Sequence, residues 1–197
     1  MTPELFLALA LFATATVFSP GPNNLMLMTS GANFGLRRTL PPLAGVAYGF
    51  PLMILPVGLG VMQIFEIWPF ANTLLKVVSI LYLLWLTWKI ANQAAPGAAG
   101  SNARPLSFLQ AAAFQWVNPK AWSMALGAIT LYAASRDLVA VAWVSGTYAV
   151  IGTVSAVTWT VLGTGLRRWL DQPGRLRLFN WSMAAILLAA MVPVLFG

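Results

Sequence analysis

The chain has 197 residues, of which 59% are hydrophobic and only 8% are charged, with a net charge of +7. A soluble domain carries about 25% charged residues, so this composition excludes a soluble globular enzyme, a disordered chain and a nucleic-acid binder. It describes an integral membrane protein of one compact domain, whose basic residues are expected in cytoplasmic loops that face anionic lipid.

Six apolar segments follow one another along the chain, each long enough for the roughly 20 residues that a membrane-spanning helix needs. We assign all six to helices, because an open sheet cannot span lipid and the sequence lacks the alternation of barrel strands. The third segment carries tryptophans near its ends, as an interfacial aromatic belt requires. The polar stretch 92–105 predicts a flexible central loop. The segments cover residues 3–34, 40–64, 69–90, 106–134, 138–166 and 176–196.

The first segment is too long for one straight span and is interrupted near its middle. As a continuous helix it would measure roughly 48 Å, whereas the hydrocarbon core is about 30 Å thick. The interruption is the motif Ser-Pro-Gly-Pro-Asn-Asn at residues 19–24, whose two prolines remove backbone donors. Gly21 followed by Pro22 is typical of the start of a new helix, with an N-cap and a first helical residue.

The fourth segment contains a second interruption, Gln-Trp-Val-Asn-Pro-Lys at residues 115–120. Asn118 followed by Pro119 again predicts an N-cap and a first helical residue. The two matched breaks suggest that one transporter domain contains two repeats, 1–91 and 106–197, joined by the loop 92–105. Each repeat has three helices, and because three is odd the repeats must enter the membrane from opposite sides. The alternative is that the prolines only kink and pack two helices.

Basic residues outside the spans fall almost entirely in alternate loops. One side of the membrane holds eight of them, whereas Arg136 lies on the opposite side. The positive-inside rule places the basic side in the cytoplasm. We therefore expect a multi-pass protein of the bacterial inner membrane with both termini in the periplasm, and a first segment that is retained because Met1 to Glu4 lack the basic start of a signal peptide. The eight are Arg37, Arg38, Lys89, Arg104, Arg167, Arg168, Arg175 and Arg177.

The motif at residues 19–24, followed by Gly-Leu-Arg at residues 35–37, resembles the signature of the LysE/RhtB family of amino-acid exporters. The likeness continues through residues 43–45, 82–90 and 114–120 and covers essentially the whole chain. Within the family the chain looks closest to the proteins that export cysteine and O-acetylserine. The resemblance implies six spans and efflux driven by the proton gradient.

One departure from the family pattern bears on the chemistry. Many members have an acidic residue after the glycine of the second span, where this chain has Gly49 and Phe50. A carboxylate proton carrier and a site for basic amino acids are therefore not carried over from the resemblance. Lys120 is the one obvious titratable candidate for the proton carrier.

Two lysines lie inside the expected spans. Lys76 is about two turns into the third segment, from where its side chain can reach the outer interface. Lys120 lies near the centre of the fourth segment, in the first helical turn after the break, where the helix dipole disfavours a cation. A bound anion would relieve that cost. The alternative is a lysine satisfied by backbone carbonyls that the breaks have freed.

We therefore hypothesise that a zwitterionic amino acid binds between the two breaks. Its carboxylate would meet Lys120 and the free N–H groups of the half-helix after it, and its ammonium would meet asparagines and freed carbonyls. Glycines and tyrosines of the second and fifth segments would line the cavity, although the two glycines of the second segment also form a G-x-x-x-G pair that favours close helix packing. The expected site residues are Pro20, Gly21, Pro22, Asn23, Asn24, Asn118, Pro119, Lys120, Gly45, Tyr48, Gly49, Gly146 and Tyr148.

The sequence thus predicts a secondary transporter, not an enzyme, that exports a small amino acid or derivative as its two halves rock. The chain has no cysteine and no histidine, so we expect no cofactor, disulfide or metal site. Its expected partners are the substrate and the lipid bilayer, with no nucleic acid, and a homodimer is left open. Two alternatives remain: a non-transporting membrane interaction or assembly subunit, and a carrier for another small zwitterionic metabolite.

Overall fold

The computed structural model describes residues 1–61, 67–68, 70–93, 104–170, 172–190 and 192. In that part of the chain every regular element is a helix, which confirms the all-helical expectation. The ends of the predicted second and sixth segments and residues 94–103 of the central loop lie outside the described residues. The elements are α1 (Pro3–Phe18), α2 (Pro22–Phe34), α3 (Leu36–Pro56), the π-helical turn η1 (Val57–Val61), α5 (Phe70–Ala91), α6 (Phe108–Phe114), the 3-10 turn η2 (Gln115–Val117), α7 (Pro119–Tyr132), α8 (Leu138–Leu166) and α9 (Pro173–Ala189).

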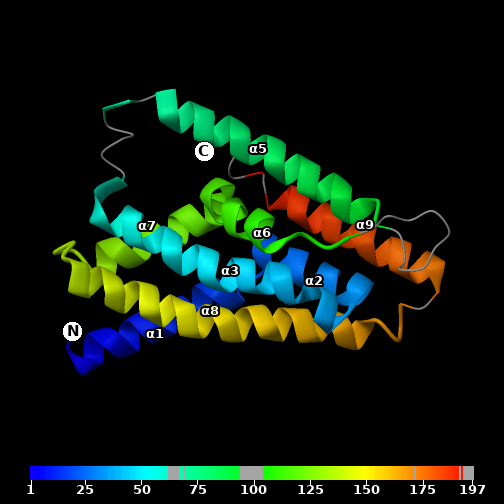
Figure 1. Ribbon diagram of the computed structural model, residues 1–197, viewed down its shortest axis with the longest axis horizontal. Coiled ribbons are helices and arrows are strands. Elements are labelled where there is room, and N and C mark those ends of the chain that lie inside the picture. The colour runs from blue at the N-terminus through cyan, green and yellow to red at the C-terminus, as the bar shows by residue number, and fades with distance from the viewer. Residues whose placement is uncertain (62–66, 69, 94–103, 171, 191, 193–197) are drawn as a thin grey trace.

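The helices run along the long axis of the molecule and alternate in direction (Figure 1). α1 starts at the end that carries the N-terminus, α3 returns toward it, and α5 runs away from it again. The second half starts at the opposite end, from where α6 and α7 run back, α8 runs forward and α9 returns. The two halves thus begin from opposite ends, as an inverted repeat requires. The repeat and its six spans stay predictions.

Three helical stretches are long and apolar enough to cross a membrane by themselves: Leu36–Gly60, Thr73–Ala91 and Leu138–Leu166. The α1–α2 pair adds a fourth span if it is counted as one bent helix, with 55° between its parts. The described part of α9 has 17 residues. α6 and α7 are separate short helices, because the chain leaves the α-helical path between them.

Apolar side chains cover the outside of the long helices, as a surface in contact with lipid requires. On α5 and α8 these side chains form exposed stripes that no other described part of the chain covers. The exposed apolar residues of these two helices include Leu74, Val77, Val78, Leu81, Leu84, Trp88, Val139, Trp143, Val150, Val154, Val157 and Val161.

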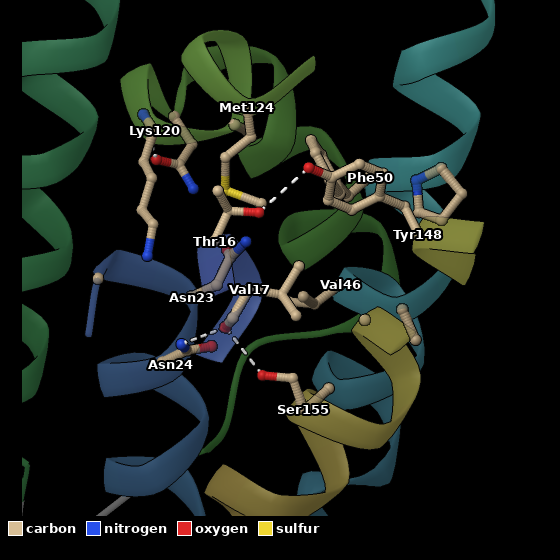
Figure 2. Close-up of a pocket in the computed structure, with 17 residues that line it drawn as sticks. Thr16, Val17, Asn23, Asn24, Val46, Phe50, Lys120, Met124, Tyr148 and Ser155 are labelled. Carbon is tan, nitrogen blue, oxygen red and sulfur yellow. Dashed lines mark hydrogen bonds between the residues drawn. The ribbon is translucent and has the colours of Figure 1, made fainter. Parts of the chain in front are cut away.

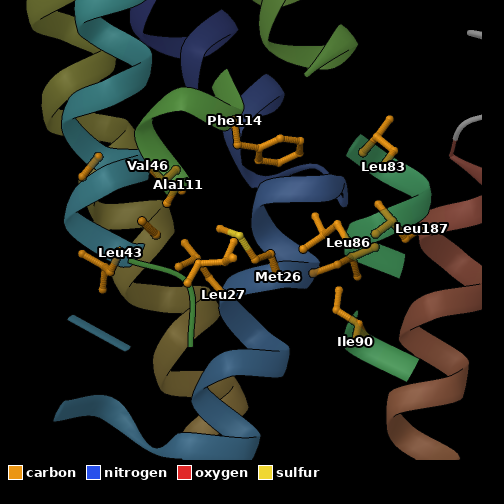
Figure 3. Packing of buried hydrophobic residues seen from close by; sticks show 14 of the residues in the cluster. Met26, Leu27, Leu43, Val46, Leu83, Leu86, Ile90, Ala111, Phe114 and Leu187 are labelled. Carbon is orange, nitrogen blue, oxygen red and sulfur yellow. The ribbon is translucent and has the colours of Figure 1, made fainter. Parts of the chain in front are cut away.

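α2 is the central element of the fold. All its residues are buried except Asn23 and Met28, and its apolar side chains meet those of α3, α5 and α9 in one cluster (Figure 3). It approaches α8 almost backbone to backbone. A Cβ atom added to Gly31 would lie 2.3 Å from the carbonyl oxygen of Thr160, and one added to Gly163 would lie 2.0 Å from that of Met28. Only glycine allows this crossing.

Gly35 alone connects α2 to α3. Its φ of 77° lies in the region that glycine favours, its N–H donates to Gly31 O at 2.9 Å, and an added Cβ would lie 2.7 Å from Nη1 of Arg167. At the same end, Asn33 and Asn180 exchange two side-chain hydrogen bonds of 2.9 and 3.3 Å, and Asn180 also donates to the backbone at the end of α5. This joins α2, α5 and α9.

Seven of the eight basic residues counted above flank this same end of the molecule, because the starts of α3 and α9 lie beside the ends of α5 and α8 (Figure 1). Asp137 and Arg136, by contrast, precede α8 at the other end. The fold therefore gathers the basic side chains at one end, as the charge pattern predicted. The orientation of that end in a membrane stays a prediction.

Candidate functional site

A pocket lies where the two helix breaks meet (Figure 2). Its cavity volume is about 40 Å³, which is smaller than the roughly 300–1,000 Å³ of typical small-molecule sites. One wall is polar and comes from the breaks, and the other is largely apolar and comes from α3, α7 and α8. The lining includes Thr16, Gly21, Asn23, Asn24, Asn118, Lys120, Val46, Ala47, Phe50, Met124, Tyr148, Ser155 and Ala156.

The first break consists of the three residues 19–21 between α1 and α2. Ser19 has φ and ψ of −61° and 139°, and Gly21 is fully extended at −179° and 179°. Gly21 is the N-cap of α2 and Pro22 its first residue, which confirms the expected helix start. A Cβ on Gly21 would lie 2.7 Å from Cδ of Lys120, so the absence of a side chain lets Lys120 cross here.

The second break is shorter and better capped. The chain leaves α6 through η2 and has one extended residue, Asn118, with φ of −92° and ψ of 108°. The Asn118 side chain accepts a hydrogen bond from the backbone N–H of Lys120 at 3.2 Å, and Pro119 is the first residue of α7. Here too the predicted N-cap and helix start are confirmed.

Lys120 reaches from the second break to the first. Its Nζ donates to the carbonyl oxygen of Ser19 at 2.6 Å, to Oγ of Ser19 at 2.7 Å and to the carbonyl oxygen of Pro20 at 3.3 Å. These three bonds use all three ammonium hydrogens, and they cap the C-terminal end of α1, where the helix dipole favours a cation. The contacts match the alternative expectation, a lysine satisfied by freed carbonyls. A role toward a substrate carboxylate stays a proposal.

Gln115 is a site residue that the sequence did not single out. Its side-chain amide exchanges two hydrogen bonds with Asn23, from Asn23 Nδ2 at 2.9 Å and to Asn23 Oδ1 at 3.1 Å, and it also donates to Ala111 O at 2.9 Å. Gln115 is fully buried. It therefore fixes the orientation of the Asn23 amide at the pocket edge. A glutamine in an apolar run was the available signal, but its partner is distant in sequence.

Two hydroxyl contacts, also absent from the sequence hypothesis, tie α8 to the end of α1. Tyr148 Oη lies 3.1 Å from Thr16 Oγ1, and Thr16 in turn donates to Phe12 O at 2.8 Å. Ser155 Oγ donates to Val17 O at 2.9 Å. Because Ser and Thr in apolar helices commonly bond backbone carbonyls, these residues carried no signal of a site.

Six of the expected residues line the pocket, and three prolines lie in the backbone of the breaks without lining it. The remaining four lie elsewhere. The six that line it are Gly21, Asn23, Asn24, Asn118, Lys120 and Tyr148; the prolines are Pro20, Pro22 and Pro119.

The four expected residues outside the pocket are placed there by helix packing. A Cβ on Gly45 would lie 2.4 Å from the carbonyl oxygen of Phe108, and one on Gly49 would lie 2.7 Å from Cα of Ala112. Both glycines therefore serve close packing of α3 on α6, the favoured alternative of the sequence analysis. Tyr48 is 60% exposed, and an added Cβ on Gly146 would meet nothing within 4 Å. These four do not line the pocket between the breaks, and a role for them toward substrate stays a prediction.

Among the described residues that line the pocket, Lys120 has the only charged side chain. In the described part of the chain, no three carboxylate, histidine or cysteine side chains gather where they could hold a metal ion. The polar groups that this pocket offers are therefore neutral amides, hydroxyls, backbone groups and one ammonium.

Comparison with known proteins agrees with this arrangement. Residues 14–196 match the family described as LysE type translocator. The chain belongs to this family. The expectation of a transporter rather than an enzyme is thereby confirmed, as is the family resemblance.

Curated relatives with the name cysteine/O-acetylserine efflux protein match over nearly the full length. One from Escherichia coli is 34% identical over 179 residues, covering 89% of this chain and 90% of the relative. A second, from another Escherichia coli strain, is 32% identical over 100% of both chains, and one from Klebsiella pneumoniae is 30% identical over 98% of both. No solved structure matches the chain significantly.

Proposed function

We propose that this chain exports a small neutral amino acid across the bacterial inner membrane, and that the substrate binds in the pocket between the two breaks. The observation that carries the proposal is the meeting of both breaks at one pocket, with Lys120 bonded across them. Discontinuous helices at the interface of two repeats are the common site architecture of secondary transporters. The names of the relatives support cysteine and O-acetylserine as the first substrates to test.

The polarity of the pocket supports a neutral amino acid over a basic one. The lining residues include no carboxylate that could pair with a second cationic group. The substrate carboxylate would approach Lys120 and the backbone N–H groups at the start of α7, where the dipole is positive. To bind it, the Lys120 ammonium would exchange at least one of its bonds to Ser19 and Pro20.

Packing of the half-helices supports the inverted repeat. α1 packs on α8, the second helix of the second repeat, and α6 packs on α3, the second helix of the first. These contacts are exchanged by the repeat symmetry, and the α3–α8 and α5–α9 pairs map onto themselves, whereas the extensive contact of α2 with α8 has only a weak counterpart between α7 and α3. Alternating access would then result from rocking of one repeat against the other. We further propose that the proton gradient drives the efflux.

Reporter fusions test the orientation. Fusions after Asn102 and after Asp171 should report a cytoplasmic location and a fusion at the C-terminus a periplasmic one, because the basic residues gather at one end. A cytoplasmic C-terminus would contradict both the orientation and the inverted repeat.

Transport itself is tested with purified protein in proteoliposomes loaded with L-cysteine or O-acetyl-L-serine. Saturable counterflow of the radiolabelled amino acid is expected. A screen of other amino acids for relief of toxicity on overexpression extends the test to further zwitterionic metabolites. If no amino acid is exchanged, the alternative of a membrane interaction or assembly subunit holds instead.

A further inference from the structure

The corner of the pocket around the carbonyl oxygen of Val17 is lined by two side chains from different halves of the molecule. Asn24 Nδ2 donates to Val17 O at 2.7 Å, and Ser155 Oγ donates to the same oxygen at 2.9 Å. Figure 2 shows both side chains converging on Val17 from α2 and α8. Both are nearly buried, at 6% and 2% exposure. Substrate in the pocket would therefore meet them as a pair.

The hydrogens of this pair are already in use. Asn24 Nδ2 donates its second hydrogen to Ser19 O at 2.9 Å, and the one hydroxyl hydrogen of Ser155 goes to Val17. What each side chain still offers is an oxygen lone pair. Among the described residues no donor bonds the Oδ1 atom of Asn24. The two side chains thus present acceptors only, although the backbone N–H groups of Asn23 and Asn24 lie beside them in the first turn of α2.

The opposite polarity prevails at the second break. Asn118 Oδ1 is occupied by the cap of α7, which leaves its Nδ2 as a donor, and the Lys120 ammonium adds a charged donor to the same pocket lining. The side chains of the pocket therefore present acceptors at Asn24 and Ser155 and donors at Asn118 and Lys120. An ammonium is the group that gains most from a pair of side-chain acceptors, because a charged donor forms the stronger hydrogen bonds.

We propose that Ser155 and Asn24 form the subsite for the substrate ammonium. This rests on the proposed function, and it adds Ser155 as a specificity-determining residue. It also implies that the substrate must have a free amine. N-acylated amino acids would offer Ser155 and Asn24 a neutral amide in place of the ammonium, and acids without an amino group would offer no donor, so both should be poorer ligands.

The test compares two serines of α8. Ser155→Ala removes the acceptor in the pocket, whereas Ser145→Ala is its matched control. Ser145 is also buried on α8, and it also donates to a backbone carbonyl, that of Pro51 at 2.9 Å, but it does not line the pocket. Both variants lose one comparable hydrogen bond between helices, so a purely structural effect should be equal in the two.

Binding of radiolabelled L-cysteine to the purified full chain is measured, with cysteamine and 3-mercaptopropionate as competitors. The first competitor has the amine without the carboxylate, and the second the carboxylate without the amine. We expect Ser155→Ala to weaken L-cysteine and cysteamine about three- to tenfold, as loss of one hydrogen bond to a charged group predicts. The inhibition constant of 3-mercaptopropionate should not change, and Ser145→Ala should bind all three as wild type does.

Two outcomes overturn the subsite. Equal weakening of all three compounds by Ser155→Ala would show a general structural role, and wild-type affinity for both amines would show no role at all. A Ser155→Ala protein that does not fold would be replaced by Ser155→Cys, whose weaker sulfur acceptor should give an intermediate loss for the amines alone. If wild-type protein binds L-cysteine but the variants behave alike, only the subsite fails. If wild-type protein binds and transports no amino acid, the proposed function fails with it.

Discussion

The two helix breaks start from the same kind of motif, a cap followed by proline, but they lie in different surroundings. After the first break, α2 is buried on nearly every side and touches α8 through glycines. After the second, α7 buries only one narrow face of Ala121, Ala125, Ala128 and Ile129. Equivalent sequence signals therefore produce one half-helix that is fixed in the core and another on the periphery.

This difference indicates where the molecule can move. A helix held on all sides by tightly packed neighbours shifts only with them, so α2 and α8 form one body. α7 has fewer buried residues, and its side chains bond the first break through Lys120 and α1 through Tyr132. A change in the pocket is therefore most readily taken up at the second break.

The largest effect should come from the glycine contact that fixes α2. Gly163→Ala would place a Cβ 2.0 Å from the carbonyl oxygen of Met28, and the required backbone shift should destabilise the fold by about 2–3 kcal/mol. Gly146→Ala on the same helix should leave stability unchanged, because its Cβ would meet nothing within 4 Å. Thermal unfolding in detergent measures both. Equal stabilities would mean that α2 is not held as described.

The next effect concerns the first break. Replacing Pro20, Gly21 and Pro22 together by Ala should let helix continue through the pocket and abolish transport while the protein still inserts. At the second break, Pro119→Ala should retain at least half the activity, because the Asn118 cap persists. Proteoliposome counterflow compares the two proteins. Normal transport by the triple variant would reduce the first break to a packing kink.

Lys120 joins the two breaks, and its removal tests whether that link serves the substrate. Lys120→Met should fold and insert but bind substrate at least tenfold more weakly, as loss of a charged hydrogen bond of about 1.5–3 kcal/mol predicts. Lys120→Arg should rescue poorly, because its planar fork does not fit a cage shaped for an ammonium.

The matched control is Lys76→Met, which changes an exposed lysine of α5 and should leave transport largely intact. Equilibrium binding and unfolding temperature are measured together. Wild-type affinity combined with a lower unfolding temperature in Lys120→Met would show that the lysine only caps α1.

The smallest predicted effect concerns the charged N-cap of α8, Asp137, which contrasts with the neutral N-cap of α7, Asn118. The pKa of the Asp137 carboxyl is lowered by hydrogen bonds from the Ser135 hydroxyl and the backbone N–H of Ala140. A lowered pKa means that the carboxylate stabilises the fold above the pKa of the unfolded chain, and that this contribution is lost as pH falls through the folded value. Asp137→Asn should therefore lower the unfolding temperature slightly at pH 7 and not at acid pH. A difference that persists in acid would contradict this origin.

The sequence predicted those features whose cause is local. Gly21-Pro22 and Asn118-Pro119 predict helix starts, because capping depends on residues that are neighbours in sequence. The partners of Gln115 and Ser155 could not be predicted, because both are distant in sequence. Gln115 bonds Asn23, 92 positions away, and Ser155 bonds Val17, 138 positions away. The positions of Tyr48 and Tyr148 relative to the pocket could not be predicted from the sequence either. They occupy similar places in the two repeats, yet only packing places Tyr148 in the pocket and Tyr48 on the surface.

The start of the second apolar segment also differs from the expected one, for a physical reason. The second segment was expected to begin at residue 40, whereas α3 begins at Leu36, since Gly35 turns the chain within one residue. Pro41 and Pro42 lie inside α3, beyond its first turn, so each removes one backbone hydrogen bond of the helix. A hydropathy profile alone does not predict a helix start at Leu36, because the first turn of α3 contains two arginines.

The joint at Gly35 has a consequence for protein engineering. With a single residue between α2 and α3, there is no spare chain in which to place an epitope tag, a fluorescent protein or a cleavage site. An insertion would have to break the N–H bond from Gly35 to Gly31 and displace the nearby Arg167 side chain. Homologues with longer connections at this position should accordingly be rare, and deletions or insertions here should be among the least tolerated length changes in the chain.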